Sequence, residues 1–207
     1  MEQVEQGSDA WKQLRLGKVT ASRVADVIAK TKTGYSASRS NYEAQLICER
    51  LTGTVAESYT NSAMQHGTET EPLAIAAFEV KTGLTVNKID FVDHPTIANS
   101  GASPDGLIAE ENSLIECKCP NTATHLDTLL SGKVPSKYIT QMTWQMATTG
   151  RDACYFVSFD PRLPAHLQLF VQKVQYDPKY AAELEQEVIR FLDEVEQKIK
   201  QLEKLNG

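Results

Sequence analysis

Two stretches of the chain, SPDGLIA (residues 103–109) and LIECK (residues 114–118), decide the fold. Pro-Asp-Gly is a strong turn sequence, and the apolar residues that follow it predict a short strand. The polar residues 110–113 predict a reversal, after which the second stretch returns as the other strand of a β-hairpin. Side chains alternate across a strand, so Glu116 and Lys118 share one face. We expect the hairpin to bring Asp105, Glu116 and Lys118 together at a sheet edge.

This combination of charges suits a site for a hard cation. Mg²⁺ prefers oxygen ligands, which Asp105, Glu116 and the main-chain carbonyl of Cys117 can supply. A bound metal acidifies a water molecule and neutralises charge in phosphodiester hydrolysis, and Lys118 could orient that water or the scissile phosphate. The pattern also fits a surface hairpin with solvated charges on its outer face. The residues around the hairpin must distinguish the two interpretations.

The composition predicts one soluble domain over residues 1–207. Hydrophobic residues make up 41% and charged residues 23% of the chain, as in ordinary globular proteins. The net charge of −6 argues against a protein that simply coats DNA, but it allows an enzyme that neutralises phosphate with metal ions. No apolar run is long enough to span a membrane, and residues 1–5 are not a signal peptide, so we expect a cytoplasmic protein without a membrane partner.

The four cysteines are Cys48, Cys117, Cys119 and Cys154. In this compartment they should be reduced. A zinc or iron–sulfur site is a weaker alternative, because Cys117 and Cys119 lie on the strand face opposite Lys118.

Periodicity and turn signals predict an α/β fold in which a central mixed β-sheet is flanked by helices. Helices are expected at 8–16, from Thr20, and at 41–52, 62–82, 122–131 and 135–149, with a polar loop at 30–40 and further strands at 84–92, 97–101, 153–159 and 167–176. A long amphipathic helix at about 178–205 carries the apolar stripe Leu184, Val188, Phe191, Leu192, Val195, Ile199 and Leu202. That stripe either closes over the core or, since it runs to the last residues, contacts another subunit.

Other polar residues could join the hairpin. Glu71 could add a carboxylate if its helix lies beside the hairpin, although most helical glutamates are solvated. Tyr138, Gln141 and Gln145 share a helix face, where a glutamine is either exposed or holds the attacking water. Arg15, Ser22 and Arg23 gather near the start of the second predicted helix, where an anion is favoured; the alternative is a surface arginine beside a capping serine.

These segments, in the order in which they follow along the chain, make it resemble the family of phage lambda exonuclease and the YqaJ-type viral recombinases. That family belongs to the PD-(D/E)XK nuclease superfamily. The matching blocks span residues 5 to 180: Glu5-Gln6-Gly7, Asp9-Ala10-Trp11, Leu14-Arg15-Leu16-Gly17, Thr20-Ala21-Ser22, Gly67 with Glu71, Ser103-Pro104-Asp105-Gly106-Leu107, Glu116-Cys117-Lys118-Cys119-Pro120, Tyr138 with Gln141, Tyr155-Phe156 and Asp160-Pro161-Arg162.

The resemblance implies a restriction-endonuclease-like core and a Mg²⁺-dependent, processive 5′→3′ exonuclease. Such an enzyme degrades one strand of linear double-stranded DNA to mononucleotides and leaves a 3′ single strand for phage-type recombination. It also implies two Mg²⁺ ions, with Mn²⁺ as a substitute, a ring-shaped homotrimer and a single-strand annealing protein as partner, in a bacterial or phage-infected cell.

The resemblance also implies a role for individual residues. Asp105 and Glu116 correspond to the metal carboxylates, Glu71 to an accessory acidic residue, Lys118 to the catalytic lysine and Gln141 to an active-site glutamine. With the Cys117 carbonyl, the three carboxylates are the metal ligands that we expect. Arg15, Ser22 and Ser103 correspond to residues that hold the terminal 5′-phosphate, and Asp93 is a candidate for a further family aspartate.

The chain departs from the family at one position of the phosphate pocket. Thr124 stands where the family has an arginine, and His125 follows it. Either His125 or a lysine elsewhere supplies the missing charge, or the requirement for a 5′-phosphate is looser. A structure-specific endonuclease and a non-catalytic DNA-binding or docking module remain as alternatives to the exonuclease.

Overall fold

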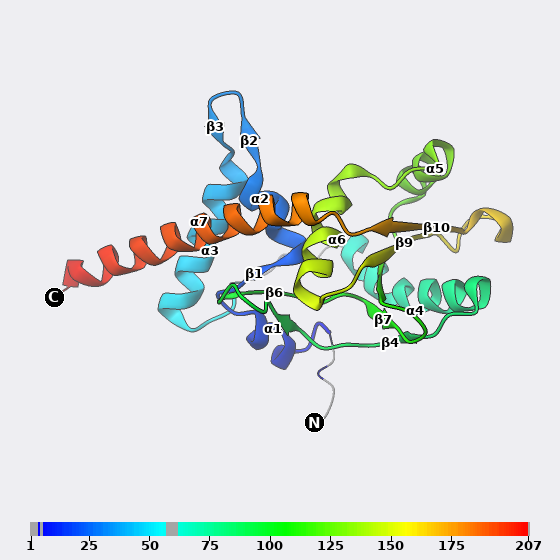
Figure 1. The fold of residues 1–207 in the computed structure, drawn as a ribbon, viewed down its shortest axis with the longest axis horizontal. Coiled ribbons are helices and arrows are strands. Elements are labelled where there is room, and N and C mark those ends of the chain that lie inside the picture. Colours follow the sequence, from blue (N-terminus) through cyan, green and yellow to red (C-terminus); the bar gives the residue numbers. More distant parts are fainter. Residues whose placement is uncertain (1–3, 5, 57–61, 207) are drawn as a thin grey trace.

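The structure is a computed structural model that describes residues 4, 6–56 and 62–206. Residues 1–3 and the first residue of the earliest family block, Glu5, lie outside this part. A helical half and a sheet half lie side by side, and the long helix α7 (Pro178–Glu203) runs across the helical half (Figure 1). Within the described ranges, no helix is both long and apolar enough to cross a membrane.

The sheet half is built on the predicted hairpin. Strands β7 (Gly106–Ile108) and β8 (Ser113–Lys118) pair antiparallel, and β8 pairs parallel with β9 (Ala153–Phe159). Strand β10 (Leu169–Gln175) and strand β4 (Val86–Asn87) complete a five-stranded sheet of order β10-β9-β8-β7-β4. The mixed sheet is confirmed. The expectation of a site at a sheet edge is wrong, because β8 is the middle strand.

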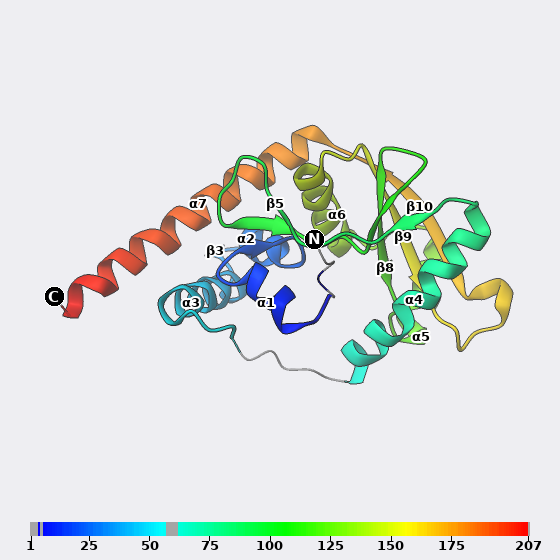
Figure 2. The ribbon, with the colours of Figure 1, turned by 90° about the horizontal axis from the view of Figure 1, so that it is seen from below.

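Helices cover both faces of this sheet, as Figure 2 shows. Helix α4 (Ser62–Thr82) packs Phe78 on the face that carries Ile115. Helix α6 (Ser136–Thr149) packs Met142 on the opposite face, which carries Leu114. Alternation along β8 therefore turns Glu116 and Lys118 toward α6. The predicted α/β fold with a sheet flanked by helices is confirmed.

The helical half contains most of the N-terminal chain. Its elements are α1 (Asp9–Arg15), β1 (Val19–Thr20), the 3₁₀ turn η1 (Ala21–Arg23), α2 (Val24–Ile28), α3 (Ala37–Thr52) and a small sheet of order β1-β6-β5, with β6 at Ser100–Ala102 and β5 at Val92–Asp93. The apolar stripe of α7 is buried against these elements from Leu184 to Ile199. Only Leu202 of the stripe, at 41% exposure, lies outside the core. The interpretation that α7 closes over the core is confirmed for residues 184–199.

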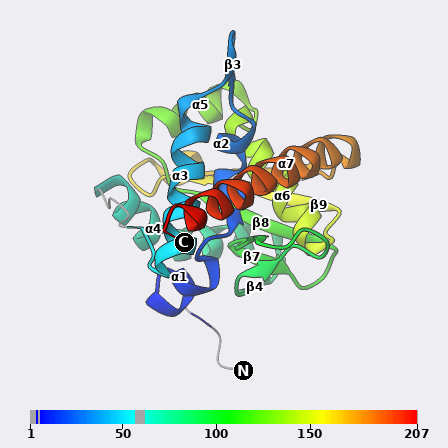
Figure 3. The same cartoon turned by 90° about the vertical axis from the view of Figure 1, so that its left-hand side faces the viewer.

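The helix expected from Thr20 is present: Thr20 is the N-cap of η1, and α2 follows η1 directly. Thr20 itself is extended beside β6, where the Val19 N–H donates to the Asn99 carbonyl. Two expectations for the connecting segments are wrong. The loop expected at 30–40 contains the hairpin β2 (Lys30–Thr31) and β3 (Gly34–Tyr35), which projects from the body in Figures 1 and 3. In place of the single strand expected over 84–92, the chain forms two short strands, β4 (Val86–Asn87) and β5 (Val92–Asp93).

Three further short elements complete the described chain. Helix α5 (Thr122–Ser131) follows β8, and the 3₁₀ turns η2 (Ala165–Leu167) and η3 (Lys204–Asn206) lie before β10 and after α7.

Candidate active site

A pocket of about 200 Å³ lies where the helical half meets the sheet half. The residues that line it come from α1, η1, α4, the loop before β7, β8 and α6: Gln6, Trp11, Arg15, Thr20, Ala21, Ser22, Glu71, Ser103, Asp105, Glu116, Cys117, Lys118 and Gln141. Nine of the ten residues that the sequence assigned to a site line this one pocket; His125 does not. The segments involved are far apart in the chain, so the fold itself assembles the pocket.

Asp105 and Glu116 are fixed by the hairpin. Asp105 is 8% exposed and Glu116 is 1% exposed. The main-chain N–H of Cys117 donates to Asp105 Oδ2 at 2.6 Å, which anchors the carboxylate of the turn against the neighbouring strand. Burying an ionised carboxylate is costly unless it is paired or hydrogen-bonded. The predicted convergence of Asp105, Glu116 and Lys118 is present.

Three groups surround the carboxylate of Glu116. Gln141 Nε2 donates to Oε1 and Gln145 Nε2 donates to Oε2, each at 2.6 Å, and Lys118 Nζ forms an ion pair with Oε1. The glutamines are four residues apart on α6, so both amides face β8. Gln145 is fully buried. The sequence predicts that it shares a helix face with Gln141, but we assigned it no contact with Glu116. Its i, i+4 spacing from Gln141 is the signal that identifies it.

The pocket concentrates negative charge. Burial and the charges of Glu116 and Glu71 raise the pKa of Asp105 well above its ordinary value. Burial and the charge of Glu116 likewise raise the pKa of Glu71. Burial lowers the pKa of Lys118, but the charges of Glu116 and Asp105 outweigh it and raise that pKa, so the lysine stays protonated. One lysine thus faces three carboxylates, an excess that a divalent cation would neutralise.

The donor set therefore fits a hard cation. The side chains do not form a finished cage, because no group of three His, Cys, Asp or Glu side chains in the described ranges is arranged to hold a metal. Glu116 Oε1 already contacts an amide and the lysine, and Glu116 Oε2 accepts one amide N–H.

The wall contributed by the helical half is positively charged. Arg15 lies over the Trp11 ring, with Cζ 3.8 Å from the ring centroid, and Arg15 Nη2 donates to Thr20 Oγ1 at 3.2 Å. Trp11 Nε1 donates to Ser103 Oγ at 3.1 Å. Burial lowers the pKa of Arg15, and no carboxylate among the described residues pairs with it. Arg15, Ser22 and Ser103, the residues of the predicted anion site, thus line one pocket.

Trp11 and Thr20 also line this wall, and the sequence did not single them out as site residues. Their roles depend on contacts with residues that are distant or lie across a turn, and the local sequence carries no signal for such contacts.

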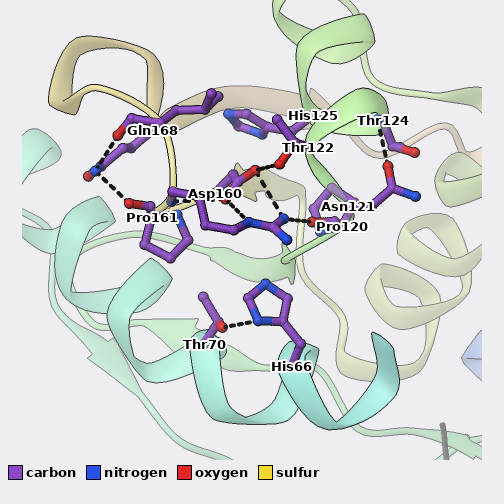
Figure 4. Close-up of polar contacts among 12 residues, drawn as sticks. His66, Thr70, Pro120, Asn121, Thr122, Thr124, His125, Asp160, Pro161 and Gln168 are labelled. Atoms are coloured by element: carbon purple, nitrogen blue, oxygen red, sulfur yellow. Dashed lines mark hydrogen bonds and ion pairs between the residues drawn. The ribbon is translucent and has the colours of Figure 1, made fainter. Parts of the chain in front are cut away.

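The expectation that His125 supplies charge to the pocket is wrong. His125 is fully buried; its Nδ1 lies 2.7 Å from Ser158 Oγ and its Nε2 lies 2.9 Å from the Leu167 carbonyl. Thr124 completes the first turn of α5, where its N–H donates to Asn121 Oδ1 (Figure 4). Asp93 is also away from the pocket: it forms an ion pair with Lys18 on the surface, at 2.6 Å.

The chain belongs to the YqaJ-like viral recombinase domain family, whose model matches residues 10–152. That range includes the hairpin, both glutamines and the arginine wall. None of the curated protein sequences compared with the chain is significantly similar to it.

Solved structures agree with the family assignment. An alkaline exonuclease (LHK-Exo) from Laribacter hongkongensis is 51% identical, covers 96% of this chain and 98% of its own, and has a TM-score of 0.89. Its complex with dAMP has a TM-score of 0.90 at the same identity and coverage. A phage related exonuclease from Haemophilus somnus 129PT is 16% identical over 92% of this chain and 96% of its own, with a TM-score of 0.69; it supports the fold alone.

The crowding of carboxylates predicts that Asp105→Asn stabilises the metal-free protein at pH 8. Because the pKa of Asp105 is raised in the folded state, its ionisation destabilises that state as the pH rises through the folded pKa. We expect a gain of at least about 1 kcal/mol, or ~2–4 °C in Tm, that shrinks toward pH 5. Thermal unfolding in EDTA at both pH values measures it. A loss of stability of equal size at pH 5 and pH 8 would contradict the electrostatic account.

Proposed function

We propose that this chain is a DNA exonuclease that degrades one strand of linear double-stranded DNA from its 5′ end. The observation that carries the proposal is a single pocket with a carboxylate–lysine cluster on one wall and an unpaired, desolvated arginine on the other. A phosphodiester next to a terminal phosphate matches those two walls. The 51% identity to an alkaline exonuclease over nearly the whole chain supports it.

The proposed cofactor is Mg²⁺, as two ions, with Mn²⁺ as a substitute. Asp105, Glu116, the Cys117 carbonyl and Glu71 would hold it. Bound ions would acidify a water molecule and stabilise the charge of the transition state. Glu116 Oε2 accepts one hydrogen bond, from Gln145, and a carboxylate oxygen has a second lone pair with which it would coordinate the metal.

Lys118 and Gln141 provide the remaining chemistry. Lys118 stays protonated beside Glu116, so its ammonium donates to the attacking water or to a phosphate oxygen. Gln141 donates to the Glu116 oxygen that Lys118 also contacts. It therefore orients that carboxylate, and once the carboxylate moves toward a ligand, its amide is free to hold the water.

The polarity of digestion follows from the arginine wall. Arg15, Ser22 and Ser103 offer a guanidinium and two hydroxyl groups to the terminal 5′-phosphate, a charge-assisted arrangement that favours a dianion over a 5′-hydroxyl. Only the first phosphodiester then reaches Lys118, so the products are mononucleotides and the other strand remains as a 3′ single strand. Such a strand is the substrate that a single-strand annealing protein needs in phage-type recombination.

Processive digestion would need an enzyme that stays on its DNA, and we propose a ring-shaped homotrimer. Leu202 and Leu205 are 41% and 75% exposed at the end of α7, which extends beyond the body of the molecule in Figure 1. Exposed apolar side chains on a projecting helix support a subunit contact.

Glu116→Ala and Lys118→Ala should each reduce Mg²⁺-dependent digestion of a 5′-phosphorylated duplex by at least roughly 100-fold, since each removes a group that acts at the reacting phosphate. A gel time course measures this, with Lys133→Ala, an exposed lysine, as the matched control. Undiminished digestion by both variants, with normal folding by circular dichroism, would refute the site.

Arg15→Ala should abolish the preference for 5′-phosphate over 5′-hydroxyl ends, because the desolvated guanidinium is the charged group of the anion site. The ratio of the two digestion rates is the readout, and Arg190→Ala, which changes an exposed side chain of α7, serves as the control. An unchanged ratio in the Arg15 variant would remove Arg15 from the phosphate site.

Multi-angle light scattering should give a mass three times that of the 22.9 kDa chain. Leu202→Lys together with Leu205→Lys should shift the protein toward the monomer, since a buried charge in a subunit contact is unfavourable. A monomer of the wild-type chain at micromolar concentration would exclude the ring.

A further inference from the structure

The two oxygens of the Glu116 carboxylate are held by different sets of partners. Oε1 contacts two groups, Gln141 Nε2 at 2.6 Å and the ammonium of Lys118. Oε2 accepts from Gln145 Nε2 at 2.6 Å, and among the described residues Gln145 alone donates to it. The terminal torsion of a glutamate side chain is soft, so a carboxylate that is held at one oxygen can still rotate. The contact from Gln145 therefore fixes the plane of this carboxylate.

Gln145 acts on the pocket only through Glu116. Its side chain is 0% exposed, and it is not among the residues that line the pocket. Gln141, one helical turn earlier on α6, does line the pocket. A substrate in the pocket can therefore contact Gln141 but not Gln145. Any effect of Gln145 on the reaction must pass through the carboxylate that it holds.

The backbone that carries Gln145 is rigidly placed. Its neighbours Trp144 and Met146 are both buried. Trp144 Nε1 donates to the Gly101 carbonyl at 3.2 Å, and Met146 packs in the core cluster that contains Leu114 of β8. These contacts hold α6 on two sides of Gln145. The amide is thus directed at Glu116 before any ligand arrives, as a preorganised site requires.

Stability does not explain a glutamine at position 145. Gln145 Oε1 is buried and has no hydrogen-bond partner among the described residues. A buried acceptor without a partner costs free energy, which an apolar side chain of the same length would avoid. Turning the amide over would place Oε1 against the carboxylate, so the charge of Glu116 requires the N–H on that side. The contact with Glu116 is the feature that calls for an amide here.

We infer that Gln145 is a positioning residue that directs Glu116 Oε2 toward a divalent cation. The inference rests on the proposed function, because the metal is part of that proposal. With Gln145 in place, the free lone pair of Oε2 keeps one direction in a pocket that Asp105 and Glu71 also line. Groups that orient a metal ligand in this way typically contribute roughly 10- to 100-fold in metal affinity.

Calorimetric titration of Mn²⁺ into the protein without DNA tests this role. Gln145→Met keeps the size of the side chain and removes the donor, so it should weaken Mn²⁺ binding by at least about ten-fold. Thr148→Val is the matched control and should bind Mn²⁺ as the wild type does. Thr148 is also buried on α6, and its hydroxyl has no partner among the described residues. Gln145→Leu replaces Gln145→Met if the latter does not fold. Equal Mn²⁺ affinities in the wild type and a folded Gln145 variant would overturn the inference.

The Mg²⁺ dependence of digestion gives a second readout. Gln145→Met should raise the Mg²⁺ concentration for half-maximal rate by at least about ten-fold, while KM for DNA and the rate at saturating Mg²⁺ stay within about three-fold of the wild type. A lower maximal rate with an unchanged Mg²⁺ midpoint would assign Gln145 a merely structural role and overturn the inference. A wild type that binds Mn²⁺ but digests no DNA would instead contradict the proposed function, and weaker Mn²⁺ binding by Gln145→Met would still support the positioning role.

Discussion

The buried carboxylate of Glu116 is the interaction on which the rest of the site depends. At 1% exposure it would be costly in the absence of partners. The fold provides two glutamine amides from α6 and the ammonium of Lys118. Those bonds require α6 to lie on one face of β8 with Gln141 and Gln145 pointing inward. The positions of β8 and α6 are therefore specified together, and the apolar contacts of Met142 and Leu114 lie on the same face.

The junction of two halves explains why one pocket carries opposite charges. The sheet half contributes carboxylates that raise one another's pKa, and the helical half contributes Arg15, which is desolvated and lies on Trp11. Trp11 also donates to Ser103 beside the hairpin, so the two walls are connected directly. The pocket therefore presents carboxylates on one wall and a guanidinium on the other.

The structural features that depend on local sequence patterns can be predicted from the sequence. Turn chemistry and alternation are sufficient for the hairpin and for the shared face of Glu116 and Lys118, and the helical period is sufficient for the burial of α7. What depends on distant partners could not be predicted. The extended conformation of Thr20 requires β6, the burial of His125 requires Ser158 and the Leu167 carbonyl, and the middle position of β8 requires β9. The metal ligands stay a prediction, as do the polarity of digestion and the ring.

The most direct test of the central claim is the fate of labels on a linear duplex. One end of a strand carries a label at its 5′-phosphate, and a second duplex carries it at the 3′ end. If the carboxylate–lysine cluster cuts next to the arginine wall, Mg²⁺ releases the 5′ label at once as a mononucleotide, the 3′ label persists until late, and EDTA stops both. Early release of the 3′ label, or cutting of closed circular duplex, would contradict the account.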